Sequence, residues 1–208
     1  MKKNIKCDLF FHFLCSMNDK TQPVERHPWK PFIPEKARYL FLGTFPPQEH
    51  RWSMAFYYPN PSNDFWRIMG LIFYGDRDAL WNREQRRFDL DAIKALLNRE
   101  RIALWDTGMA VRRLKGNASD KFLEIVEPID LAALLDKVPT ISHIITTGEK
   151  ATGVIAAQAG VELPPIGQPV DCQVGGHPIT LWRMPSTSRA YPLSLEKKAE
   201  AYRVVFTR

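Results

Sequence analysis

The chain of 208 residues suits one domain, or one domain with a short extension, and is long enough to bury a sizeable core. Hydrophobic residues make up 45% and charged residues 25%, ordinary values for a globular protein, and no apolar run approaches the roughly 18 residues of a membrane span. Lysine and arginine number 29 against 23 acidic residues, a net charge of +6 that leans weakly toward a polyanionic partner.

The N-terminus begins like a signal peptide, with basic residues before apolar ones, but Asp8 and His12 interrupt the apolar stretch and no cleavage site follows. We therefore expect no functional signal peptide, and Met17 could equally start the protein. Residues 1–30 are predicted to be an N-terminal extension that need not be ordered, and residues 31–208 to be the domain.

The chain has three cysteines, Cys7, Cys15 and Cys172, without CxxC spacing. This pattern argues against a disulfide framework and against a zinc or iron–sulfur site that needs four thiolates. We therefore predict a reducing, cytoplasmic setting. His50, His143 and His177 show no metal-ligand spacing either, so no metal site is predicted.

Four short apolar runs predict buried strands, at residues 37–43, 101–106, 142–148 and 179–184. Helical patterns separate them, at residues 63–75, 88–99, 130–138 and 149–160, and a last helix begins after Ser194. Nearly continuous apolar strands that alternate with helices predict an α/β fold with a mainly parallel sheet covered on both faces. A hairpin within residues 170–182 would add an antiparallel edge.

Ligands of open α/β sheets bind outside the carboxyl ends of the strands. The four predicted ends read GTFPP (43–47), WDTG (105–108), TTGEK (146–150) and MPSTSRAYP (184–192). Gly43 either lets a backbone approach a ligand or only makes a turn. Asp106 is the best-placed carboxylate, although such an aspartate is also common as a turn or cap residue.

The segment MPSTSRAYP presents three consecutive hydroxyls and one guanidinium between prolines: Ser186, Thr187, Ser188 and Arg189. Hydroxyls and an arginine in a stiff turn suit a nucleic-acid phosphate or insertion into a duplex groove. The alternative is a turn in which the hydroxyls cap nearby backbone groups.

The segment FYYPNPSNDFW (56–66) combines five rings, amides and two prolines. Phe65 and Trp66 fall on the helix that follows and are expected in the core. Tyr58 lies in the loop that the prolines bound and is a natural platform for a flat substrate. Asn63 is predicted to be the N-cap of the helix, and from there its amide can order a water or read the edge of a base.

Together these segments resemble the uracil-DNA glycosylase superfamily, and most of all its hypoxanthine (deoxyinosine) DNA glycosylase branch. LGTFPP (42–47), YYPNPSNDFW (57–66) and MPSTS (184–188) carry the likeness, which spans about residues 36–207. The resemblance implies a three-layer αβα sandwich around a four-stranded, mainly parallel sheet. It also implies a monofunctional DNA glycosylase, acting without a cofactor on a deaminated base flipped out of DNA.

Carried over by the resemblance, Gly43, Thr44, Phe45 and Pro46 line the base pocket, and Tyr58 stacks on the extruded base. Asn63 is implied to be the main catalytic group. The loop of Ser186, Thr187 and Ser188 is implied to pinch the DNA strand, and to it we add Arg189 by our own inference.

Two positions depart from strong uracil glycosylases. Phe45 stands where those enzymes carry aspartate or asparagine, and Met184 where they carry histidine or asparagine. Both substitutions resemble the hypoxanthine branch, so hypoxanthine is expected as a substrate in preference to uracil. The partner is therefore predicted to be DNA that contains a damaged base, bound by a monomer.

Two other functions remain open from the sequence. A nucleic-acid-binding module of the same fold without turnover would fit the missing acid at position 45. A hydrolase or transferase of small nucleotides would use the same strand-end pocket.

Overall fold

A computed structural model describes residues 22–115 and 120–207. Its centre is a five-stranded sheet in the order β5-β2-β8-β10-β9, with four parallel strands and β9 antiparallel at one edge. The strands are β2 (Tyr39–Gly43), β5 (Ile102–Asp106), β8 (His143–Thr146), β9 (Pro169–Val174) and β10 (His177–Arg183). The four predicted strands and the antiparallel hairpin are thus confirmed.

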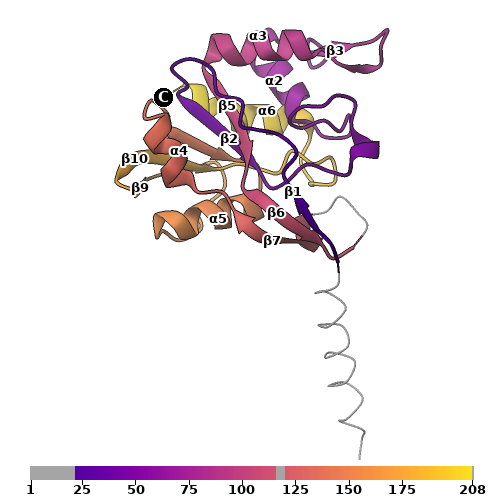
Figure 1. Ribbon diagram of the computed structural model, residues 1–208. Coiled ribbons are helices and arrows are strands. Elements are labelled where there is room, and N and C mark those ends of the chain that lie inside the picture. Colours follow the sequence, from indigo (N-terminus) through magenta and orange to yellow (C-terminus); the bar gives the residue numbers. More distant parts are fainter. Residues whose placement is uncertain (1–21, 116–119, 208) are drawn as a thin grey trace, which may run out of the picture.

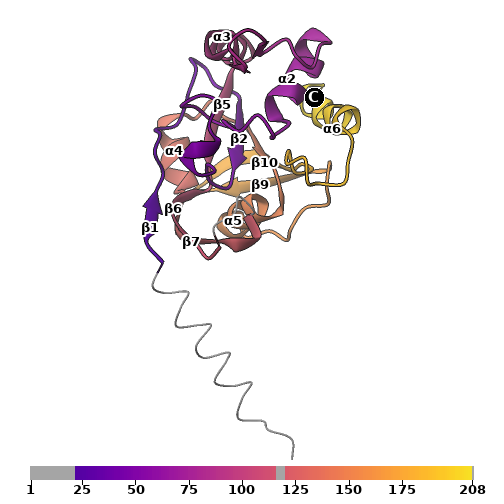
Figure 2. The same cartoon turned by 90° about the vertical axis from the view of Figure 1, so that its right-hand side faces the viewer.

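Helices cover both faces of this sheet, so the fold has the three layers that were expected (Figures 1 and 2). The helices are α2 (Phe65–Tyr74), α3 (Leu90–Glu100) and α6 (Leu195–Arg203) on one face, and α4 (Leu131–Lys137) and α5 (Glu149–Ala159) on the other. Alternate strand residues serve different cores, because neighbouring side chains of a strand point to opposite faces. Phe41 packs with α2, α3 and α6, whereas Leu40 and Leu42 pack with α4 and α5.

Local capping explains where most of these helices begin. The side chains of Asp89, Asp130 and Ser194 accept backbone N–H groups at the starts of α3, α4 and α6. Helix α2 differs from the prediction, because its N-cap is Asp64 and not Asn63. Asn63 lies one residue earlier, where its Oδ1 accepts the Phe65 N–H at 2.9 Å.

A second, three-stranded antiparallel sheet was not expected from the sequence. It consists of β1 (Val24–Arg26), β6 (Gly108–Arg113) and β7 (Leu123–Pro128), in the order β1-β6-β7. Strand β7 is mostly exposed and lacks the apolar run by which the central strands were found. Because β1 pairs with β6, the structure extends the folded domain back to Val24, into the segment assigned to the extension. The rest of that extension, residues 1–21, lies outside the described residues.

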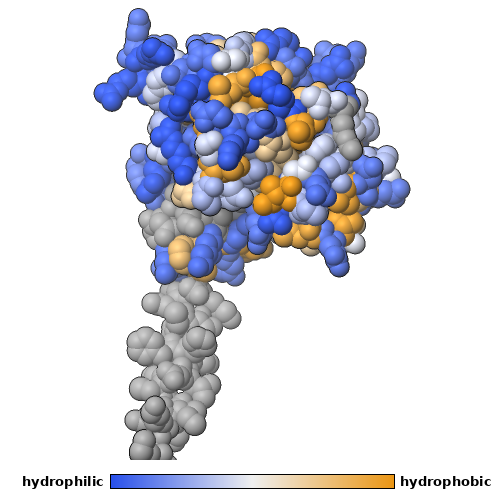
Figure 3. Space-filling model, turned by 180° about the vertical axis from the view of Figure 1, so that it is seen from behind, coloured by the Kyte–Doolittle hydropathy of each residue, from blue (hydrophilic) through white to orange (hydrophobic). Residues whose placement is uncertain are grey.

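Smaller elements complete the chain. They are the hairpin of β3 (Trp81–Asn82) and β4 (Arg87–Phe88) and the 3-10 turns η1 (Glu49–Arg51), η2 (Asp120–Phe122) and η3 (Val204–Phe206). In the part of the chain that the structure describes, no helix combines the length and the apolar character that crossing a membrane requires. The face opposite to that of Figure 1 is mostly hydrophilic, with apolar side chains in separate patches (Figure 3).

Candidate active site

A pocket of about 700 Å³ opens at the carboxyl ends of the parallel strands. Every residue proposed for the site from the sequence lines it, although these residues come from segments as far apart as the loop after β2 and the loop after β10. They are Gly43, Thr44, Phe45, Pro46, Tyr58, Asn63, Asp106, Ser186, Thr187, Ser188 and Arg189. The strand-end rule therefore located the cavity correctly.

Backbone hydrogen bonds hold the loop that follows β2. The carbonyl oxygens of Gly43 and Thr44 each accept a backbone N–H, from Thr107 and Gly108, at 2.9 Å. The carbonyl of Pro46 accepts Nη2 of Arg113 at 2.7 Å. This wall of the pocket is consequently fixed before any ligand arrives.

Asp106 lies at the end of β5 with its carboxylate in the pocket wall, and 8% of its side chain is exposed. A Cβ atom at Gly43, on the neighbouring strand, would lie 2.4 Å from Oδ1 of Asp106. A side chain there would collide with the carboxylate. Glycine at position 43 is therefore what lets Asp106 occupy this place.

His27 was not predicted from the sequence as part of the site. Its Nε2 donates to Oδ2 of Asp106 at 2.9 Å, and its side chain is 4% exposed. Its Nδ1 lies 2.8 Å from the carbonyl oxygen of Trp29. The rings of Phe45 and Tyr57 lie 5.5 and 6.0 Å from the imidazole, so its orientation is fixed on several sides.

Tyr57 fastens the segment that carries His27 to the domain. Its hydroxyl donates to the carbonyl of Lys30 at 2.9 Å. Burial first, and then the charges of Asp106 and Tyr58, raise the pKa of Tyr57 far above its ordinary value. The hydroxyl therefore stays protonated and keeps its role as a donor at any physiological pH.

Tyr58 follows in a conformation that non-glycine residues seldom adopt, with φ at 49°. Its ring stacks on Phe65, with the centroids 3.7 Å apart and the planes 12° apart. Its hydroxyl lies 3.2 Å from Oγ1 of Thr147, at the end of β8. The loop thus holds one face of a pocket ring against the core, as a rigid platform requires.

Asn63 lies where the loop 57–63 meets the loop after β10. Its side chain is oriented by the bond from the Phe65 N–H to Oδ1, and its backbone forms an isolated antiparallel bridge with Ser188. The next residue, Asp64, donates its N–H to the carbonyl of Thr187 at 2.8 Å. The two predicted motifs are therefore joined through their backbones.

The side chains of the loop 186–189 lie partly in the interior and partly on the surface. The side chain of Thr187 is buried, whereas Ser188 and Arg189 are exposed. Nε of Arg189 donates to Oδ1 of Asp64 at 3.1 Å. Arg189 therefore lies at the mouth of the pocket, held by a carboxylate. Phe65 and Trp66 are fully buried, as predicted, and so is Met184.

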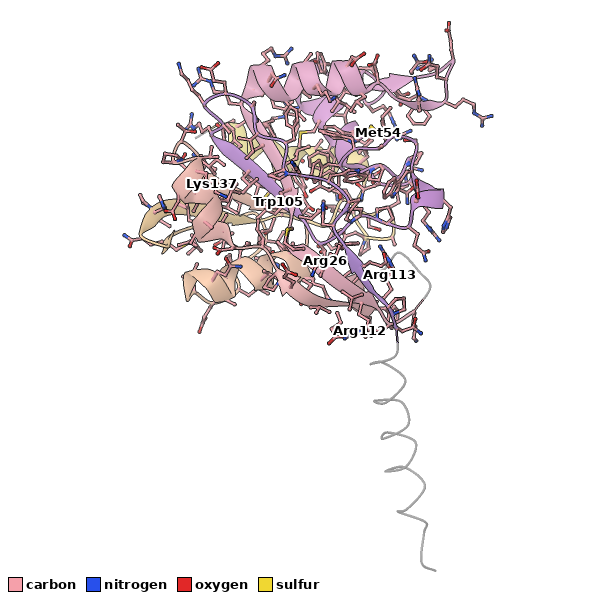
Figure 4. The ribbon with its side chains drawn as sticks, in the orientation of Figure 1. Arg26, Met54, Trp105, Arg112, Arg113 and Lys137 are labelled. Carbon is pink, nitrogen blue, oxygen red and sulfur yellow. The ribbon has the colours of Figure 1, made fainter. Side chains whose placement is uncertain are left out.

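Among the described side chains, the pocket is lined by four basic residues but by a single acidic one, Asp106. The basic residues are Arg51, Arg113, Lys121 and Arg189. Three arginines of the second sheet, Arg26, Arg112 and Arg113, lie nearby (Figure 4). Each of them already pairs with a glutamate. Arg189 is paired too, but its partner Asp64 also pairs with the buried Lys198. An anionic ligand would therefore meet Arg51, Lys121 and Arg189 first.

The chemistry available here is that of an amide, a carboxylate with its histidine, aromatic rings and hydroxyls. Within residues 22–115 and 120–207, no three side chains of the kinds that ligate metals come together. Such a set can hold a flat polar molecule and place a water molecule against it.

Two relatives are similar to this chain in sequence. A hypoxanthine DNA glycosylase of Methanosarcina barkeri is 31% identical over 133 residues, which are 62% of this chain and 74% of the relative. One of Methanosarcina acetivorans is 31% identical over 120 residues, 57% of this chain and 68% of the relative.

Among solved structures, a solution NMR structure from Methanosarcina acetivorans, provisionally named a uracil DNA glycosylase, has the same fold. Its TM-score is 0.56 at 24% identity, and the match covers 88% of this chain and 99% of that one. No family model matches the chain.

Proposed function

Since the chain belongs to the hypoxanthine DNA glycosylase family of the uracil-DNA glycosylase superfamily, we propose that its pocket receives hypoxanthine in preference to uracil. The protein is a DNA N-glycosylase that acts on deaminated bases. The observation that best supports our assignment of the site is that Tyr58, Asn63, Asp106 and the loop 186–189 line one cavity.

The base must leave the duplex before it is released. A glycosidic bond cannot be attacked inside the stack, and flipping a nucleotide costs a few kcal/mol. Two interactions with DNA would offset this cost. The phosphates would be contacted by Arg51, Lys121 and Arg189, and the loop would insert the exposed Ser188 into the duplex groove. The extruded base would then stack on Tyr58.

Asn63 is proposed to hold the water that attacks C1′ of the sugar. An amide has no usable pKa for accepting a proton, so Asn63 positions this water and does not deprotonate it. The Phe65 N–H fixes the orientation of the amide in advance. Reaction from a fixed geometry lowers the barrier, because little reorganisation remains to be done.

Asp106 is proposed to recognise the deaminated base. Deamination of adenine changes the ring nitrogen N1 from a lone pair into an N–H group, and deamination of cytosine changes N3 in the same way. A carboxylate only accepts hydrogen bonds, so it favours the N–H of hypoxanthine and repels the lone pair of adenine. His27 holds this acceptor in place through Oδ2.

Asp106→Asn is expected to reduce the discrimination between hypoxanthine and adenine by about tenfold, the equivalent of one hydrogen bond of about 1.4 kcal/mol. The amide can offer its NH₂ to the adenine lone pair, which the carboxylate cannot. The measurement is the ratio of single-turnover excision rates on duplexes that differ only in this base. Equal losses on both bases in Asp106→Asn would mean that Asp106 does not select the base.

His27→Phe should lower excision of hypoxanthine, and His27→Gln, which keeps a donor, should restore part of it.

Tyr58→Ala is expected to weaken binding to hypoxanthine-containing DNA by about 1–3 kcal/mol, the usual value of base–aromatic stacking. Binding to undamaged duplex should change little, because no base is extruded there. Fluorescence anisotropy with the two duplexes measures both affinities. An unchanged affinity for the damaged duplex would remove Tyr58 as the stacking platform.

A panel of labelled duplexes tests the function itself. Each carries a single uracil, hypoxanthine, xanthine or ethenoadenine, and alkali treatment cleaves any abasic site that forms. We expect cleavage first of all at hypoxanthine. Salt-sensitive DNA binding without cleavage would instead indicate a binding module. The absence of both binding and cleavage would favour a hydrolase of small nucleotides.

The monomeric state and the cytoplasmic setting stay predictions.

A further inference from the structure

A lysine without solvent exposure lies behind the active-site loops. Lys198 belongs to α6, and its side chain is 0% exposed. Its ammonium group donates to Oδ2 of Asp64 at 2.9 Å and to the carbonyl oxygen of Ser188 at 2.8 Å. One turn later on the same helix, the buried Tyr202 hydroxyl donates to the carbonyl of Pro185 at 2.7 Å. Helix α6 thus grips the loop 185–188 from behind at two points.

The two groups that Lys198 joins are those that flank Asn63. Asp64 follows Asn63 directly in the chain, and Ser188 pairs with Asn63 across the antiparallel bridge. The N–H of Asp64 also reaches the carbonyl of Thr187. The ammonium group therefore closes a ring of contacts around the backbone of Asn63, although it does not touch the pocket itself.

Stability alone does not account for an ion pair at this place. Taking a lysine and an aspartate out of water costs several kcal/mol for each ion, and well-packed apolar side chains of similar volume often stabilise as much or more. What an ion pair adds is a fixed geometry, because the ammonium group must lie within hydrogen-bond distance of two particular oxygen atoms.

The charges around Asp64 also indicate a role for Lys198 beyond stability. Its carboxylate faces Lys198 on one oxygen and the half-exposed Arg189 on the other. A third cation is close by, since burial first, and next the charge of Arg189, lower the pKa of Arg67. Because Lys198 already neutralises Asp64, the positive charge of Arg189 remains available to a phosphate at the pocket mouth.

We propose that Lys198 is a positioning residue that locks Asn63 to the DNA-gripping loop 186–189, so that the water-holding amide and the phosphate contacts keep one fixed relation. The proposal rests on the proposed function. Lys198 lies about 10 positions after Ser188 and outside every motif of the sequence. Under the proposal, its loss slows catalysis although it does not touch the substrate.

Lys198→Met tests the proposal, because methionine keeps the volume and removes the charge. At saturating enzyme, the single-turnover rate on a hypoxanthine duplex is expected to fall by tenfold or more, since small displacements of a reacting group cost up to roughly a hundredfold. Lys197→Met is the matched control. Lys197 is the exposed neighbour on the same helix, and its variant should keep the wild-type rate.

The double variant Asp64→Asn/Lys198→Met separates positioning from stability. Lys198→Met alone leaves Asp64 buried without its main cation and should lower Tm. The double variant removes both buried charges, so its Tm should return toward the wild-type value while its excision rate stays low. A double variant that regains both the Tm and the rate would overturn the proposal, because Lys198 would then matter only for stability.

A readout without catalysis keeps this proposal separate from the glycosylase assignment. Hydrogen exchange at the Asp64 amide, which is bonded to the Thr187 carbonyl, reports the lock directly. Exchange should become faster in Lys198→Met and remain unchanged in Lys197→Met. If wild type excises no base but this difference appears, the assigned function fails and the lock stands. Equal exchange in all three proteins would contradict the lock whatever the activity.

Discussion

Replacing Asn63 with alanine is expected to lower the rate of hypoxanthine excision by at least about a hundredfold, the usual effect of removing a preorganised polar group from an active site. The alanine side chain can neither hold a water molecule nor accept the Phe65 N–H. Binding of the damaged duplex should change far less, because Tyr58 and the basic rim remain. Single-turnover excision and anisotropy on the same duplex measure the two effects separately.

Asn82→Ala provides a matched control for this substitution. Asn82 also uses Oδ1 to accept a backbone N–H, that of Gln85 at 2.9 Å, but it lies in the β3–β4 hairpin and lines no part of the pocket. Its variant should excise hypoxanthine at the wild-type rate. An Asn63→Ala protein as active as the Asn82→Ala control would exclude Asn63 as the catalytic group.

Gly43→Ala is the second substitution expected to have a large effect. The new Cβ would lie 2.4 Å from Oδ1 of Asp106 and 3.4 Å from the hydroxyl of Tyr58. The first distance is impossible for a real contact, so the carboxylate must move and its bond to His27 must lengthen or break. We expect excision to fall by roughly tenfold to a hundredfold, in line with the cost of a misplaced active-site group.

Gly153→Ala is the control for this second substitution. Gly153 lies within α5, where an added Cβ meets no atom within 4 Å. Alanine there should leave excision unchanged and should raise stability by about 0.5–1 kcal/mol, because glycine is unfavourable inside a helix. If Gly43→Ala retained full activity and an intact His27–Asp106 bond by NMR, Gly43 would be a turn residue and nothing more.

The central fold could be predicted because each of its signals is local. Strands such as Tyr39–Gly43 are apolar throughout, and buried parallel strands need nothing else. The β1-β6-β7 sheet could not be predicted in this way. Strand β1 has three residues, β7 is mostly exposed, and β1 is positioned by pairing with β6, more than 80 residues later in the chain. A pairing between such distant segments leaves no pattern in the local sequence from which it could be predicted.

The same distinction explains the site. Gly43, Asp106 and the loop 186–189 could be placed at one pocket because they follow strand ends, which the topology gathers at one edge. Asn63 lies farther along the loop before α2 and was proposed from the composition of that loop and from the resemblance. His27 could not be predicted, since it contacts Asp106 across 79 residues from a segment without periodicity. Lys198 could not be predicted either, because a lysine in an amphipathic helix is ordinarily exposed. Its place on the buried face of α6 is evident only from the structure, where Tyr202, one turn later, is buried on the same face. The N-cap of α2 is Asp64, whose side chain makes no capping bond, while Oδ1 of Asn63 accepts the Phe65 N–H from one residue farther out.

The most direct test of this account is a comparison of wild type and Asn63→Ala on one duplex with a single hypoxanthine and on its uracil counterpart. The account predicts that wild type releases free hypoxanthine and an equal amount of alkali-sensitive abasic site, and that it acts far more slowly on uracil. Asn63→Ala should release neither base at a comparable rate. Uracil excised as fast as hypoxanthine, or hypoxanthine excised equally by both proteins, would contradict it.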